Sequence, residues 1–72
     1  MFRNLEAEQH RKGLTNAGVA QLLNISRVTY ETKKKTGKFT RSEIVILLRF
    51  FECKFEYLFA TDNSPTPTNK VG

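Results

Sequence analysis

The sequence predicts an all-α fold, a compact domain of five short helices that contains a helix–turn–helix. Two observations predict it: apolar residues recur at the three- and four-residue spacing of helices, and residues that cap helix N-termini precede those segments. The size agrees with this fold, because 72 residues with 39% hydrophobic and 26% charged content suit one small soluble domain.

Residues 1–60 are expected to form this domain, and residues 61–72 to form a disordered C-terminal tail. The tail segment TDNSPTPTNKVG contains two prolines, no aromatic residue and a single aliphatic residue, Val71. Such a segment cannot bury enough apolar surface to offset the conformational entropy that its ordering would cost.

The first two helices are expected over residues 2–12 and 15–23. Leu5 and Gln9 lie four residues apart on one face of the first helix, and Gly13 follows as its C-terminal stop. Thr15 is a good N-cap for the second helix, which contains the next group of apolar residues.

A tight turn and a third helix follow. Asn24 tolerates the left-handed conformation that such a turn needs, and Ile25 supplies an apolar plug. Ser26 is the expected N-cap of a helix that runs through Lys34. Because this helix has few apolar residues, we expect Tyr30 to pack in the core while the other side faces outward. Two helices joined by three residues in this way form a helix–turn–helix.

The last two helices are expected over residues 41–52 and 54–60, after a basic loop at 35–39. Thr40 and Glu43 form a capping box immediately before an apolar run. The spacing i, i+3, i+4, i+7 then predicts a core stripe on the fourth helix: Ile44, Leu47, Leu48 and Phe51. The final helix is expected to add three apolar residues to the core: Phe55, Leu58 and Phe59.

The positive charge is concentrated in the middle of the chain. The net charge is +5, and residues 27–41 alone carry six basic residues against one acidic residue, Glu31. A basic segment of this density within one supersecondary unit favours a polyanionic partner.

Several function classes are disfavoured by what the sequence contains. One cysteine and one histidine cannot form an internal disulfide or a protein-only zinc site, so we expect no metal and a reducing, cytoplasmic location. The longest apolar run, residues 44–48, is too short to span a membrane. No nucleophile–base pair or glycine-rich phosphate loop is present, so we expect neither an enzyme nor a cofactor or small-molecule ligand.

Two stretches of the chain, NLEAEQHRKGLTNAGVAQLLNISRVTYE and EIVILLRFFECKFEYLF, carry a family resemblance. They resemble the Cro and XRE-type, lambda-repressor-like DNA-binding domains, and together they cover nearly all of residues 4–59. The resemblance implies a sequence-specific transcriptional regulator that binds double-stranded DNA, a Cro-like repressor of the kind found in phages and mobile elements. It also implies that the third helix enters the major groove.

The N-terminal part of such a recognition helix contacts base edges. By position, the expected base contacts are Ser26, Arg27, Val28, Glu31 and Thr32. Arg27 can bind guanine through two hydrogen bonds, Val28 can contact a thymine methyl, and Glu31 can accept a hydrogen bond from cytosine. Thr15 and Asn16 match the family's phosphate-binding positions at the start of the second helix. Four lysines are expected to bind phosphates as well: Lys33, Lys34, Lys35 and Lys38.

Apolar residues beyond the core stripe predict a homodimer. Val45, Ile46 and Phe50 lie off the stripe of the fourth helix, and Tyr57 could extend the same surface. Pairing these residues across a two-fold axis would bury them and would place two recognition helices on a palindromic site.

Two alternatives remain open at this stage. The apolar surface of the fourth and fifth helices could instead serve a protein-interaction or antitoxin-like module. Single-stranded RNA binding is less favoured, because it needs exposed aromatic side chains on which bases stack. Only Tyr30 and Phe39 lie within the basic segment.

Overall fold

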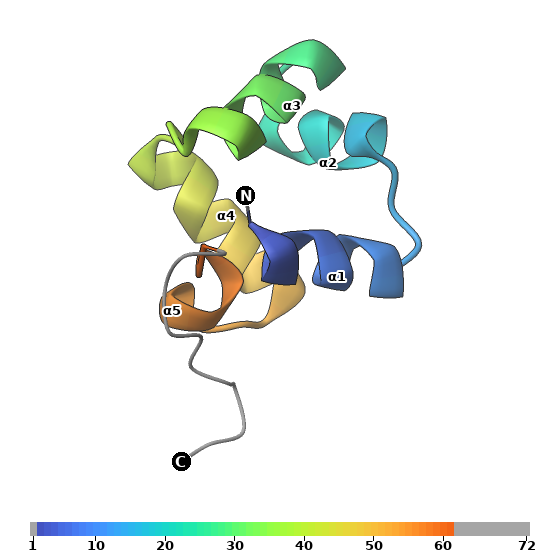
Figure 1. The fold of residues 1–72 in the computed structure, drawn as a ribbon. Coiled ribbons are helices and arrows are strands. Elements are labelled where there is room, and N and C mark those ends of the chain that lie inside the picture. Colours follow the sequence, from blue (N-terminus) through green and yellow to red (C-terminus); the bar gives the residue numbers. More distant parts are fainter. Residues whose placement is uncertain (1, 62–72) are drawn as a thin grey trace.

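The computed structural model describes residues 2–61, and over these residues the regular secondary structure is all helical, without a strand (Figure 1). The prediction of an all-α fold with five helices is confirmed. The tail predicted over residues 61–72 lies outside the described part of the chain, except for Thr61. The helices are α1 (Arg3–Arg11), α2 (Asn16–Leu23), α3 (Arg27–Thr36), α4 (Arg41–Phe51) and α5 (Phe55–Leu58).

Side-chain caps fix the start of three of these helices, each at the predicted residue. Thr15 Oγ1 accepts a hydrogen bond from the backbone N–H of Gly18 at 3.0 Å, at the start of α2. Ser26 Oγ accepts from the N–H of Thr29 at 3.1 Å, at the start of α3. At the start of α4, Thr40 and Glu43 form the complete capping box. Each cap satisfies amides that have no partner inside the helix.

Left-handed residues end α2 and α3. Asn24 has a φ of 60°, as predicted for the turn, and Gly37 has a φ of 77° at the end of α3. The third helix therefore runs to Thr36 rather than stopping at Lys34, and Lys35 belongs to the helix rather than to the loop. Gly37 sets this boundary, because its N–H bonds to a carbonyl within the last turn and glycine adopts a positive φ without steric cost.

Helices α2 and α3 pack against each other more extensively than any other helix pair in the described chain. Three residues connect them, and the N–H of Ile25 in this turn donates to the carbonyl of Ala20 at 3.0 Å. Ala20 is only 2% exposed, so a small side chain lies where the two helices meet. The geometry is that of a helix–turn–helix.

The core lies between this pair and the other three helices. Tyr30 is fully buried, which confirms the prediction that it packs inward from α3. Of the stripe predicted on α4, Leu47 and Phe51 are buried, whereas Ile44 and Leu48 are half-buried. The buried hydrophobic residues are Leu5, Val19, Ala20, Leu23, Tyr30, Leu47, Phe51 and Leu58.

The final helix contributes less to the core than expected. Leu58 is buried, and Phe59 packs edge-to-face against Phe2 and Phe39. Phe55, however, is 50% exposed, so the prediction that it belongs to the core is wrong. A helix as short as α5 has one buried face, and Leu58 and Phe59 already fill it.

Figure 1 shows how this arrangement presents α3. The helix lies along the upper margin of the molecule, α1 and α2 lie beneath it, and α5 lies at the opposite end. One side of α3 is therefore available to a partner along the whole helix.

Candidate nucleic-acid interface

One face of α3 points away from the protein. Val28, Thr32 and Lys35 follow each other at i, i+4 and i+7, and all three are exposed, Val28 to 60%. We call these three residues the outward stripe. Tyr30 and Lys34 lie on the opposite face and are buried. The inward face, with Tyr30 and Lys34, therefore attaches α3 to the rest of the protein. The outward stripe makes no contact with the core.

Arg27 and Glu31 flank the outward stripe on one side. Their side chains form an ion pair one helical turn apart, with Nη1 of Arg27 2.7 Å from Oε2 of Glu31. The same carboxylate oxygen accepts a hydrogen bond from Nδ2 of Asn16 at 3.0 Å. The hydrogen bond from Asn16 and the charge of Arg27 lower the pKa of Glu31, so its side chain is ionised at neutral pH.

On the protein side of this pair, polar side chains from α1, α2 and α3 are joined by hydrogen bonds and an ion pair. Lys34 Nζ lies 2.5 Å from Oε2 of Glu6 on α1 and 2.8 Å from Oδ1 of Asn16 on α2. Gln9 Nε2 donates to the same oxygen of Asn16 at 3.0 Å. We call Glu6, Gln9, Asn16, Glu31 and Lys34 the polar network.

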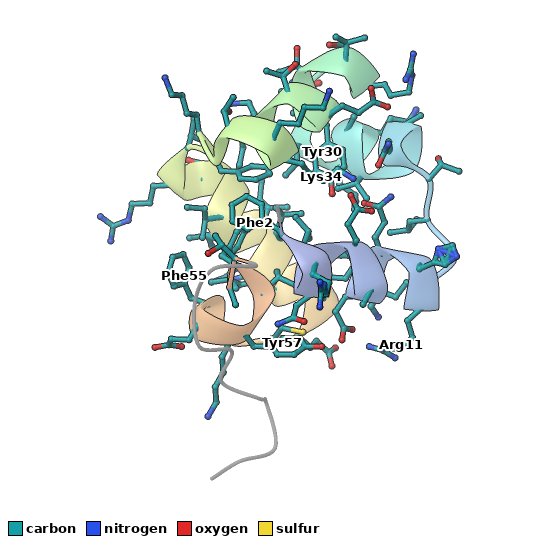
Figure 2. All side chains as sticks on the ribbon, viewed as in Figure 1. Phe2, Arg11, Tyr30, Lys34, Phe55 and Tyr57 are labelled. Atoms are coloured by element: carbon teal, nitrogen blue, oxygen red, sulfur yellow. The ribbon has the colours of Figure 1, made fainter. Side chains whose placement is uncertain are left out.

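The polar network reaches the core through Tyr30. The tyrosine hydroxyl donates to Oε1 of Gln9 at 2.8 Å, and burial raises the pKa of this hydroxyl well above its ordinary value. The ammonium group of Lys34 lies 4.8 Å from the centre of the Tyr30 ring. Figure 2 shows both side chains on the inner side of α3, directed toward α1. Every buried side-chain nitrogen and oxygen in the described chain has a hydrogen-bond partner.

Two of the four lysines predicted to bind phosphates are engaged within the protein. Lys34 is only 5% exposed, which contradicts its assignment as a phosphate contact, since a buried ammonium held by Glu6 cannot reach a DNA backbone. Lys33 pairs with Glu43 of α4 at 3.1 Å and keeps 18% of its side chain exposed. Lys35 and Lys38 are exposed and form no ion pair within residues 2–61.

The Lys33–Glu43 pair joins the end of α3 to the start of α4. Burial raises the pKa of Glu43, but the backbone hydrogen bond from Thr40 and the charge of Lys33 outweigh it, so the pKa is lowered overall. A lowered pKa in the folded state means that this pair stabilises the fold above the ordinary carboxyl pKa. The contribution is lost as the pH falls through the lowered value.

The start of α2 differs in part from expectation. Thr15 is exposed, but its hydroxyl oxygen caps the helix. The Asn16 side chain is half-buried, and both of its ends are used by the polar network. Its amide is therefore not free to bind a phosphate, whereas the first backbone N–H groups of the helix have no intrahelical partner.

The apolar residues predicted for a dimer interface fall into two groups. Val45, Ile46 and Phe50 of α4 are 42%, 38% and 36% exposed. Tyr57 is half-buried and lies against α1, where its hydroxyl donates to Oε2 of Glu8 at 3.1 Å (Figure 2). Burial, followed by the charge of Glu8, raises the pKa of this tyrosine. Phe55, which sequence analysis placed in the core, is the more exposed aromatic residue of α5.

Comparisons of the chain with protein-family models, with curated proteins and with solved structures found no match. Within the described part of the chain, no three histidine, cysteine or acidic residues are arranged to hold a metal ion. None of the described helices has the length and apolar character needed to cross a membrane.

Proposed function

We propose that this protein is a sequence-specific double-stranded DNA-binding regulator, a Cro-like repressor that inserts α3 into the major groove. The observation that carries the proposal is the outward stripe. It lies on a capped helix of a helix–turn–helix, faces away from the core along its whole length, and ends in an exposed lysine, Lys35, with a second exposed lysine, Lys38, in the loop that follows. A cytoplasmic location goes with this proposal.

The first turns of α3 supply the base contacts in this proposal. Val28 and Thr32 offer methyl groups and a hydroxyl to base edges, and Arg27 reaches the same side of the helix from its first turn. Ser26 lies at the entry to the groove, although its hydroxyl already caps the helix. Glu31 is held beside Arg27 by their ion pair.

Fewer residues are available to bind phosphates than the sequence predicted. Lys35 of the outward stripe and Lys38 beyond it are exposed, and the first backbone N–H groups of α2, which have no intrahelical partner, can bind a second phosphate beside Thr15. Lys33 is partly available, whereas Lys34 is excluded by its burial.

The proposal is tested by selecting bound duplexes from a random library and then measuring binding of variants to the selected site. Arg27→Ala should cost about 1–3 kcal/mol on that site and relax the preference at one base pair, because a bidentate contact to guanine is lost. An equal loss on all sequences would make Arg27 a phosphate contact and would contradict its assignment. A selection that yields no enriched sequence would contradict sequence-specific binding itself.

A homodimer is part of the same proposal. Val45, Ile46 and Phe50 expose apolar surface on α4, and on α5 the exposed aromatic residue is Phe55, whereas Tyr57 is half-buried. Pairing this surface across a two-fold axis would bury it and would match a palindromic site. Sedimentation at tens of micromolar should give a dimer that Phe50→Glu dissociates. A wild type that stays monomeric there rules out the dimer in the absence of DNA.

The same apolar surface supports a second candidate function, a protein-interaction or antitoxin-like module. The two functions differ in what they bind. A stable complex with another protein, in the absence of any salt-dependent binding to duplex DNA, would favour the second.

A further inference from the structure

Arg27 is not free in this structure, although it is the base-reading residue in the proposed function. Its guanidinium group is paired with Glu31 at 2.7 Å, and 57% of its side chain is exposed. To bind a base or a phosphate, the guanidinium must either leave this carboxylate or bind the DNA group and the carboxylate at the same time.

The Glu31 carboxylate is held in place by Asn16 of α2, so it does not move with Arg27. Asn16 donates to the oxygen that binds Arg27, and Lys34 and Gln9 hold the other end of the Asn16 side chain. Lys34 is in turn fixed by Glu6. The carboxylate is therefore anchored through α2 to α1 and stays at the edge of the outward stripe when Arg27 leaves.

The anchored carboxylate affects two modes of DNA binding differently. If Arg27 moves to a phosphate, it exchanges one anion for another and leaves the charge of Glu31 unpaired near the DNA backbone. If Arg27 binds guanine in the groove, its remaining N–H groups can keep a contact with Glu31, which lies one turn further along the helix. The carboxylate therefore disfavours binding of Arg27 to a phosphate and is compatible with binding of Arg27 to guanine.

We propose that Glu31 is a specificity-determining positioning residue: anchored by Asn16 and Lys34, it keeps Arg27 from binding phosphates and so suppresses binding to non-cognate DNA. This inference rests on the proposed function. In this proposal Glu31 weakens binding to non-cognate DNA, which is a recognised route to specificity. It does not accept a hydrogen bond from cytosine.

The test measures the affinity of the full chain for a selected duplex and for a random duplex, each over a range of salt concentrations. Glu31→Gln should raise the affinity for the random duplex, and it should steepen the slope of log K against log salt by about 1, because Arg27 becomes available to a phosphate. The ratio of selected to random affinity should fall. Glu56→Gln is the matched control, since Glu56 is exposed on α5, at the far end from α3 (Figure 1).

The double variant Arg27→Ala, Glu31→Gln separates this inference from simple charge repulsion. With Arg27 absent, removal of the carboxylate should leave the salt slope on random DNA unchanged. A slope that steepens equally in both backgrounds, or an effect no larger than that of Glu56→Gln, overturns the inference. A lower affinity for the selected duplex alone would show that Glu31 reads a base directly and would also overturn it. If the wild type binds no duplex at low salt, the proposed function fails first, and this inference fails with it.

Discussion

The two faces of α3 differ in what their charged residues do, although the sequence of the helix gives little sign of it. Lys34 and Lys35 are neighbours in the chain, yet Lys34 is buried against Glu6 and Asn16 while Lys35 is exposed on the outward stripe. The inward face stabilises the fold, and the outward face is the one that a partner can reach. A basic segment is therefore not the same thing as a basic surface.

The same distinction applies to the whole basic segment, residues 27–41. Arg27, Lys33 and Lys34 each pair with a carboxylate of the protein, on α3, α4 and α1 respectively. Lys35, Lys38 and Arg41 are exposed and make no ion pair within the described chain. The electrostatic attraction for a polyanion should come mainly from these three residues, and it should be weaker than the composition suggests.

The largest expected difference in stability between the two faces comes from a substitution at Tyr30, the central residue of the inward face. Tyr30→Ala should destabilise the fold by about 3–5 kcal/mol, because it leaves a cavity where a fully buried ring packed and removes the hydrogen bond to Gln9. Val28→Ala on the outward stripe should change stability by less than about 0.5 kcal/mol. Urea denaturation followed by circular dichroism measures both, and equal effects would mean that the two faces are not distinct.

A smaller effect is expected at the neighbouring lysines, where the two faces can be compared with the same substitution. Lys34→Met should lower the free energy of unfolding by about 1–2 kcal/mol, because Glu6 and Asn16 lose their shared partner. Lys35→Met should stay within about 0.5 kcal/mol of the wild type. A Lys35 variant that is as unstable as the Lys34 variant would contradict the assignment of inward and outward faces.

Local signals in the sequence were sufficient for most of the fold. Thr15, Ser26 and the pair Thr40–Glu43 cap the helices at which they were predicted, because a cap depends only on residues a few positions apart. The end of α3 was placed two residues early. The basic residues from Lys35 onward were expected to form a loop around Gly37, whereas Gly37 itself fixes the end of the helix by its left-handed conformation.

The candidate site was less predictable, because it depends on contacts between residues far apart in the chain. Glu6 and Lys34 are 28 positions apart, and no periodicity connects them. The half-buried position of Asn16 likewise follows from the packing of α1 against the helix–turn–helix. Phe55 was misplaced for a related reason, since a single turn of helix cannot bury all of its apolar residues and the spacing does not say which will be exposed.

The salt dependence of DNA binding tests most directly the claim that α3 binds DNA with its outward face. The slope of log K against log salt should be compared for the wild type, for Lys34→Met and for the double variant Lys35→Met, Lys38→Met, with circular dichroism confirming that each is folded. The double variant should lose about 2 units of slope, because two exposed phosphate contacts are removed, and Lys34→Met should keep the slope of the wild type. A Lys34→Met variant that loses slope while the double variant retains it would contradict the account.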